Sequence, residues 1–273
     1  MALSAVWRPL TVAVVVTGAT LLPQGVAEAA VPEGGNCVRS SFGDMLDRLG
    51  SPRTLAHPLP GRLLDLKNWK LTLPTGKKGK PEEIEGPDLS AFTNDFFRLN
   101  DAKDGVVFTA NAGGVTTSGS SYPRSELREM NGQELAGWSN TTGTHTLRLR
   151  EAVTLLPAVK PHVVAAQIHD ADDDVIEVRV EGQRLLVQYN DGDDDATLDP
   201  AYTLGTPYDL EIAAADGHIR VSYNGTQKAD IVTSGSGWYF KAGSYVQSNL
   251  SRGDAPDAQG QVVLYALQVE HTP

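Results

Sequence analysis

The chain has 273 residues and a single cysteine, Cys37, so no disulfide can form within it and its fold must rely on a hydrophobic core. Its 23 lysines and arginines stand against 34 aspartates and glutamates, a formal net charge of −11, which excludes a general nucleic-acid-binding protein. The same charge repels acidic polymers at long range, so an acidic ligand would require a local patch of positive side chains.

The N-terminal part of the chain is predicted to lie outside the folded domain. Arg8 precedes an apolar run over 10–22, and small residues follow at 27–29. This order is typical of a secretory signal peptide, and the run is shorter than the roughly 20 apolar residues that cross a membrane. We therefore predict a signal peptide at 1–29, a leader at 30–61, and a secreted, extracellular protein with no membrane contact after cleavage. An N-terminal membrane anchor is the alternative interpretation.

The rest of the chain reads as a series of short strands. Apolar and polar residues alternate over 146–150, 176–181, 208–212 and 219–223, and finally where Val263, Tyr265, Leu267 and Val269 are expected to share a face. A period of two is typical of half-buried strands. Asp-Gly and Asn-Gly pairs, which favour tight turns, lie beside several of these runs. The sequence thus predicts an all-β domain over 62–273, built as an antiparallel sandwich or barrel.

Three segments carry concentrated polar side chains at alternate positions. In the first, Arg124, Glu126 and Arg128 would project to one face of a strand, with the carboxylate able to orient both guanidinium groups. Taken alone, this pattern favours a solvated strand face with ordinary ion pairs.

The second segment is Gln167-Ile168-His169, which follows an apolar run. Gln167 and His169 would share a face, while Ile168 points into the core. Histidine, with an ordinary pKa of about 6.5, can act as a base near neutral pH, and the glutamine amide can donate to an anionic oxygen. Such a pair is more often structural or merely exposed.

The third segment covers residues 239–249. Six of its residues would lie on one face: Tyr239, Lys241, Gly243, Tyr245, Gln247 and Asn249. Gly243, which lacks a side chain, is expected to let a ligand approach the backbone closely. An edge strand with an aromatic stripe is the alternative. Together the three faces suit the binding of carboxylated sugars and the transfer of a proton, whereas no serine elbow, zinc-binding helix motif or phosphate loop is present.

At these residues the sequence resembles the alginate lyases of polysaccharide lyase family 7. The matching motifs are Arg124-Ser-Glu-Leu-Arg128, Gln167-Ile-His169 and Tyr239-Phe-Lys-Ala-Gly-Ser-Tyr-Val-Gln247, and the segments at 64–76 and 264–271 look like the first and last strands of the family. The resemblance covers about residues 62–271. It implies a β-jelly roll, a sandwich whose three motif strands line a concave substrate cleft. Val246 stands where the family usually has a polar residue, and by alternation it should point away from the cleft.

The resemblance also implies a reaction, the β-elimination of a uronate polysaccharide such as alginate, and a role for each residue. Arg124 and Gln167 would neutralise the sugar carboxylate, while His169 and Tyr245 would transfer protons. Tyr245 would do both jobs on mannuronate bonds, and His169 would be the base on guluronate bonds. Tyrosine, with an ordinary pKa of about 10, is a poor base unless cations such as Arg124 and Lys241 lower that pKa. The expected substrate-binding or orienting residues are Glu126, Arg128, Lys241, Gln247 and Asn249. No metal or cofactor is expected, and the partner would be an acidic polysaccharide bound by a monomer.

Several alternatives stay open at this point. One is a lyase that acts on another polyuronate such as glucuronan, and another is a non-catalytic carbohydrate-binding sandwich. A glycoside hydrolase needs two carboxylates about 5 to 10 Å apart, whereas Glu177 and Glu181 on one strand face would lie about 13 Å apart. The acidic loops at 170–174 and 191–195 lack EF-hand spacing and are interpreted as solvated turns. Ile168 points, by family association, to activity on guluronate-containing blocks, and endo or exo action is not fixed by the sequence.

Overall fold

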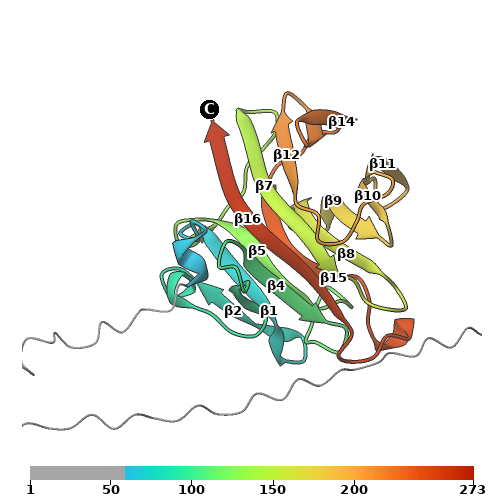
Figure 1. Ribbon diagram of the computed structural model, residues 1–273. Coiled ribbons are helices and arrows are strands. Elements are labelled where there is room, and N and C mark those ends of the chain that lie inside the picture. The colour runs from blue at the N-terminus through green and yellow to red at the C-terminus, as the bar shows by residue number, and fades with distance from the viewer. Residues whose placement is uncertain (1–58) are drawn as a thin grey trace, which may run out of the picture. The chain divides into compact units, whose positions relative to one another are not determined.

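The computed structural model describes residues 59–273 (Figure 1). The predicted signal peptide, Cys37 and nearly all of the predicted leader lie outside the described residues. Two antiparallel sheets make up almost all of the regular structure, accompanied by three short 3-10 helices, η1 (Pro60–Arg62), η2 (Asp88–Ala91) and η3 (Leu250–Arg252). No helix in this part of the chain is long and apolar enough to cross a membrane.

The first sheet has nine strands and the second has seven. In spatial order the nine-stranded sheet contains β11 (Asp194–Asp199), β10 (Arg184–Tyr189), β9 (Asp174–Glu181), β8 (His162–His169), β15 (Tyr239–Val246), β5 (Arg124–Asn131), β1 (Trp69–Lys77) and β2 (Lys80–Glu85), with β6 (Glu134–Leu135) paired to β5. The seven-stranded sheet contains β14 (Thr226–Val232), β13 (His218–Tyr223), β12 (Tyr208–Ala215), β7 (Thr144–Leu155), β16 (Gln259–Thr272), β4 (Val106–Asn111) and β3 (Phe97–Leu99).

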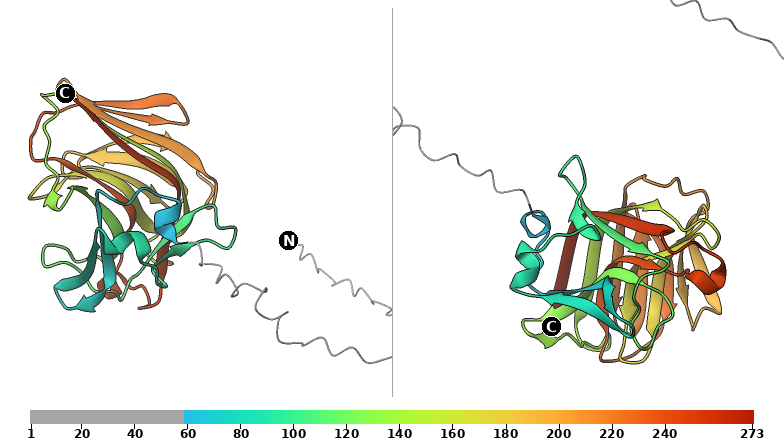
Figure 2. Two further views of the ribbon diagram at one scale, coloured as in Figure 1. Left: turned by 90° about the vertical axis from the view of Figure 1, so that its left-hand side faces the viewer. Right: turned by 90° about the horizontal axis from the view of Figure 1, so that it is seen from below.

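The core lies between the two sheets, which face each other as layers (Figure 2). Alternate residues such as Leu147 and Leu149 of β7 and Ile176 and Val178 of β9 are buried in it, as a period of two requires. The chain crosses repeatedly between the layers, so that β15 lies between β8 and β5, and β16 lies between β7 and β4. The prediction of an all-β antiparallel jelly-roll sandwich is confirmed.

The last strand departs from the predicted alternation. The register of β16 against β7 shifts between Leu264 and Ala266, which makes Tyr265 the extra residue of a β-bulge. Before the bulge, Val262 and Leu264 belong to the core cluster, while Val263 does not. The prediction that Val263 shares the core face with Leu267 and Val269 is therefore wrong, because one inserted residue exchanges the two faces of the strand.

Gly243 also has a different role from the one predicted. Its φ angle is +136°, in the region that favours glycine, and a Cβ atom there would lie 2.7 Å from the carbonyl oxygen of Ser125 and 3.0 Å from the ring of Phe108. The space beside Gly243 is thus filled by β5 and by the core. Glycine is required for close strand packing here, and the expectation that it admits a ligand is wrong.

A group of side chains that we call the Glu129 clasp (Glu129, His145 and His271) links the two sheets near the end of β16. The Glu129 carboxylate on β5 lies 2.6 Å from Nε2 of His271, whose Nδ1 lies 2.7 Å from Nδ1 of His145 on β7. The other carboxylate oxygen accepts from the indole of Trp138 at 3.0 Å and from the backbone amide of Phe240 at 2.9 Å. The clasp ties β16 and β7 to β5 and β15 of the opposite layer.

A second carboxylate, that of Glu151 on β7, is fully buried within the core. Tyr208 donates to its Oε1 at 2.9 Å, and Oε2 has no hydrogen-bond partner among the described residues. Burial raises the pKa of Glu151 from its ordinary value of 4.5 to about 7. The folded protein therefore holds a proton on Glu151 at pH values where the unfolded chain has released it.

The first prediction concerns the stability that depends on this proton. The pKa of Glu151 is higher in the folded protein than in the unfolded chain. Protonation of Glu151 therefore contributes fully to the free energy of unfolding below about pH 4.5, and this contribution is lost as the pH rises through about 7. Glu151→Gln is neutral at every pH, so we expect stability similar to wild type near pH 4 and a gain of up to about 3 kcal/mol near pH 8. Urea unfolding at both pH values measures this. Glu134→Gln, at an exposed position on β6, is the control, and an equal gain at both pH values for Glu151→Gln would contradict the prediction.

Candidate active site

The three sequence motifs lie on adjacent strands, because β15 pairs with β8 on one side and with β5 on the other. In this register Lys241 faces both Arg128 and Gln167, and Tyr245 faces Arg124. The outward face of these strands forms a cleft of about 340 Å³. Six of the predicted site residues line it: Arg124, Arg128, Gln167, His169, Lys241 and Tyr245.

Glu126 lies beneath the floor of the cleft and is only 1% exposed. Its carboxylate accepts from Arg124 at 3.1 Å, from Lys241 at 2.7 Å and from the Gln167 amide. Burial alone would raise the pKa of Glu126, but the charges of Lys241 and Arg124 bring that pKa below its ordinary value. Glu126 therefore stays ionised and fixes two cations and an amide in place, which is the orienting one of the two roles that the sequence left open for it.

The cationic floor stays charged at neutral pH. Burial and the neighbouring charge of Arg124 lower the pKa of Lys241 to about 8, while Glu126 opposes this effect. Only one of the two amide hydrogens of Gln167 is used by Glu126, so the other is free to donate to a ligand. The floor can thus offer two positive charges and an amide donor to an anionic group.

Tyr245 is held as a neutral phenol. Its hydroxyl lies 3.0 Å from Oγ of Ser120, which donates its own hydrogen to the carbonyl oxygen of Tyr122 at 3.2 Å. Either hydroxyl can donate in the contact between Ser120 and Tyr245, and Tyr245 is the donor when Ser120 bonds the carbonyl oxygen of Tyr122. Burial raises the pKa of Tyr245, outweighing the opposite effect of Arg124, whose guanidinium carbon lies 3.8 Å from the centre of the ring. The condition under which Tyr245 could act as a base, a pKa lowered by nearby cations, is thus not met, because desolvation of the phenolate costs more than the cations recover.

His169 is held in one tautomer. Its Nδ1 lies 2.7 Å from the backbone carbonyl oxygen of Asp170, which can only accept, so Nδ1 carries the hydrogen of the neutral ring. The lone pair is then on Nε2. Burial and the positive charge of Lys241 lower the pKa of His169. At neutral pH this side chain is an unprotonated base.

Tyr239 supports His169, although the sequence assigned it no role beyond its place on the shared face. The two rings stack with their centres 5.5 Å apart, and the Tyr239 hydroxyl lies 3.2 Å from Nδ1 of His169. The guanidinium carbon of Arg128, on the neighbouring strand β5, lies 3.8 Å from the centre of the Tyr239 ring. Ser120 was missed altogether, because a loop serine 125 residues from Tyr245 gives no periodic signal.

Two residues predicted to bind substrate do not line this cleft. Gln247 is 8% exposed, and its amide group bonds the carboxylate of Glu177 at 2.8 and 2.9 Å and accepts from Arg179 at 2.8 Å. Asn249 caps η3 by accepting from the backbone amide of Arg252 at 3.2 Å. Strand β15 ends at Val246, so these two residues follow the strand and bond to their neighbours instead. Val246 itself is buried in the core, as predicted.

The acidic loop after β8 forms one side of the cleft. Asp170 accepts from the backbone amides of Asp172 and Asp173 at 2.8 and 3.0 Å, and so shapes the turn, while Ala171, Asp172, Asp173 and Asp174 line the cleft. Burial and the charge of Asp173 raise the pKa of Asp174 to about 6. Within residues 59–273 no group of three or more histidine, cysteine or acidic side chains is arranged to hold a metal ion.

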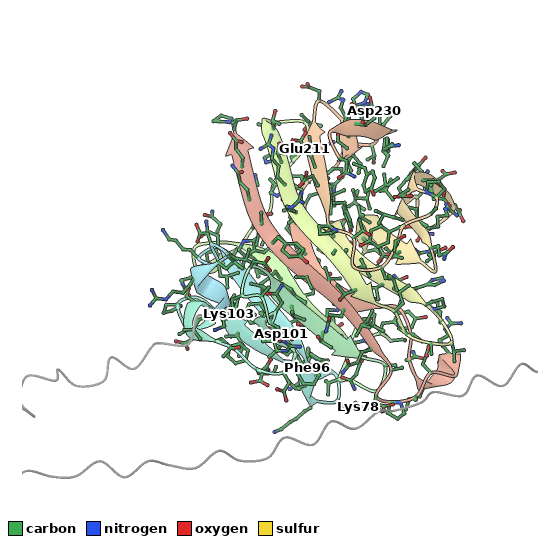
Figure 3. The ribbon with its side chains drawn as sticks, viewed as in Figure 1. Lys78, Phe96, Asp101, Lys103, Glu211 and Asp230 are labelled. Carbon is green, nitrogen blue, oxygen red and sulfur yellow. The ribbon has the colours of Figure 1, made fainter. Side chains whose placement is uncertain are left out.

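A larger hollow, of about 620 Å³, lies on the outward face of the seven-stranded sheet. Figure 3 labels Glu211 where it projects from β12. The charged side chains of this larger hollow are paired with one another: Arg148 lies 2.7 Å from Glu211, and Arg150 lies 2.9 Å from Asp209. It contains neither a histidine nor a tyrosine, so we place the active site in the smaller cleft.

An outward cleft that places an imidazole base and a phenol beside a cationic floor suits a polysaccharide lyase, which must neutralise a sugar carboxylate and transfer a proton. The family model described as alginate lyase matches residues 64–271. The chain therefore belongs to the alginate lyase family, polysaccharide lyase family 7.

Solved structures agree with this assignment. An alginate lyase from polysaccharide lyase family 7 is 51% identical, with a TM-score of 0.76, and the match covers 79% of this chain and 100% of that one. The alginate lyase from Corynebacterium sp. is 48% identical, with a TM-score of 0.75, over 78% of this chain and 98% of that one. An alginate lyase from Klebsiella pneumoniae is 42% identical over 84 residues, which span 29% of this chain and 27% of that protein.

The second prediction tests the buried carboxylate beneath the cleft. Glu126→Gln leaves Arg124 and Lys241 side by side without their counter-charge, so we expect a loss of about 3 kcal/mol in the free energy of unfolding. The matched control is Glu83→Gln, which removes the exposed partner of Lys70 on the same sheet and should cost less than about 1 kcal/mol. Denaturant unfolding of both variants measures the difference, and equal losses would contradict the assigned role of Glu126.

Proposed function

We propose that this polysaccharide lyase cleaves alginate, a 1,4-linked uronate polysaccharide, by β-elimination and leaves unsaturated uronate ends. The observation that carries the proposal is that one cleft holds His169, whose Nε2 is unprotonated, and Tyr245, whose pKa is raised by burial so that its hydroxyl keeps its proton. Membership of the alginate lyase family supports the reaction class and an acidic polysaccharide as substrate. The alginate lyases of similar structure support alginate in particular.

The main electrostatic task is set by the substrate. The C5 hydrogen of a uronate lies next to a carboxylate, and its removal loads further negative charge onto that group. Arg124, Gln167 and Lys241 would neutralise this charge, since Glu126 already holds them in position. Because they are fixed before the substrate arrives, little reorganisation is needed during the reaction.

Proton transfer would then use two residues. Nε2 of His169 takes the C5 proton, the electron pair of the C5–H bond forms the C4–C5 double bond, and the C4–O bond breaks. Tyr245 gives its proton to the departing oxygen, and exchange with solvent restores both residues. Since burial raises the pKa of Tyr245, this two-residue route is favoured over one in which Tyr245 is also the base. By the family resemblance it is the route for guluronate bonds, so we expect guluronate-containing blocks to be preferred.

The remaining parts of the proposal concern the whole chain. We propose that residues 1–29 are a signal peptide, that 30–61 are a leader, and that 62–273 form the lyase domain of a secreted, extracellular monomer. The signal peptide, the leader and secretion rest on the order of basic, apolar and small residues at the N-terminus, and the lyase domain rests on the family match over 64–271. N-terminal sequencing of the protein in the culture medium and light scattering would test them.

The third prediction is the reaction itself. Purified protein with alginate should produce the ultraviolet absorbance of an unsaturated uronate, faster on poly-guluronate than on poly-mannuronate. Tyr245→Phe should reduce the rate by about a thousandfold, because the general acid is lost. Arg150→Ala, in the hollow on the other sheet, is the control and should be fully active. Glucuronan is tested in parallel, and a product with new reducing ends but no absorbance would exclude elimination.

The fourth prediction concerns the pH profile. His169 must be neutral to accept a proton, so kcat/KM should fall about tenfold per pH unit below the pKa of His169. Burial and the charge of Lys241 lower that pKa, so the acidic limb should lie below pH 6.5. Lys241→Gln removes the second cause and should move the limb to higher pH, whereas Lys70→Gln, elsewhere along the cleft, should leave it in place. An unmoved limb in Lys241→Gln would refute the role of His169 as the base.

A further inference from the structure

The cleft continues past Tyr245 into a second hollow of about 400 Å³. The two share Gly119, Ser120 and Tyr245 in their walls. A linear polymer whose reacting sugar lies beside Tyr245 would therefore extend into the second hollow. Tyr122, Asn249 and Arg252 are among the residues that line it, and Lys160 contacts Tyr122 from beside this lining.

Two cations converge on one phenol at this place. The hydroxyl of Tyr122 accepts from Nζ of Lys160 at 3.3 Å and from Nε of Arg252 at 3.1 Å. The ammonium group of Lys160 also lies 4.9 Å from the centre of the Tyr122 ring. Burial alone would raise the pKa of Tyr122, but the hydrogen bonds from Arg252 and Lys160 bring that pKa below its ordinary value.

Neither cation has an acidic partner. No carboxylate among residues 59–273 forms an ion pair with Lys160 or Arg252. Two like charges held near one neutral hydroxyl repel each other, in a chain whose formal net charge is −11. An anion bound between them would relieve this repulsion, and each contact would be a charge-assisted hydrogen bond.

The arrangement is held in place by its own loops. Asp254, which is 4% exposed, accepts from the backbone amides of Val159 at 2.8 Å and Lys160 at 3.0 Å. Asn249 donates to the carbonyl oxygen of Ser121 at 2.9 Å while it caps η3. Three loops far apart in the sequence are thus fastened together, so both cations are positioned before any ligand arrives.

We propose that Tyr122, Lys160 and Arg252 form an outer subsite that binds the carboxylate of a sugar farther along the polyuronate chain than the one undergoing elimination. The inference rests on the proposed function, since a 1,4-linked polyuronate carries one carboxylate on every sugar. The subsite holds the polymer in register and touches no reacting atom. Its contribution therefore appears in kcat/KM for chains long enough to reach it.

The test compares uronate oligomers of increasing length with the polymer. In wild type, kcat/KM should rise once the oligomer reaches the second hollow. The double variant Lys160→Gln with Arg252→Gln should lose this rise, by about tenfold for each cation, with kcat and activity on the shortest cleaved oligomer unchanged. Added salt should weaken the binding of long chains in wild type more than in the double variant. Lys228→Gln, an exposed lysine on β14, is the matched control.

Tyr122→Phe separates recognition from bracing of the loops, because it keeps the ring and both cations but removes the shared hydroxyl. It should retain most of the length dependence. Equal losses on short and long substrates in the double variant, or a lowered Tm with unchanged length dependence, would show a structural role and overturn the subsite. A wild type that forms no unsaturated ends would overturn the proposed function itself, and the subsite with it.

Discussion

The buried carboxylate of Glu126 is the interaction on which the cleft depends. It lies on β5, next to β15, and it is the only group placed to compensate Arg124 and Lys241 within the described ion pairs. Without it, two cations would repel each other in a poorly solvated place. With it, both cations are held at the floor of the cleft by one ionised carboxylate. Strand β5 pairs with β15, and its Glu126 also balances the charges of Arg124 and Lys241.

This arrangement explains how an acidic protein can bind an acidic polymer. The negative net charge of the chain would repel the polymer from a distance, but salt screens this repulsion beyond about 10 Å. On the floor of the cleft the charges are those of Arg124, Arg128 and Lys241, while the acidic loop with Asp172 and Asp173 lines one side. In the proposed outer subsite, Lys160 and Arg252 would add two further cations beside Tyr122. Attraction is therefore local, while the rest of the surface keeps its negative charge.

Much of the fold and of the site could be predicted from the sequence, because a period of two identifies the faces of strands such as β7 and β9, and because the motifs carry distinctive side chains. The bulge at Tyr265 could not, since alternation does not reveal an inserted residue. The contact of Ser120 with Tyr245 joins a loop to a strand and has no period at all. The direction in which the pKa of Tyr245 moves depends on burial, which only three-dimensional packing determines.

The Glu129 clasp gives the tail of the last strand an influence on the catalytic layer. A chain shortened to residue 270 would keep every strand yet lose His271 and its bond to Glu129. The same carboxylate receives the amide of Phe240, the immediate neighbour of Lys241. Removing His271 is therefore expected to loosen the contact between Glu129 and the backbone of β15. The C-terminal boundary chosen for expressing or fusing this domain would then affect the proposed catalytic cleft as well as folding.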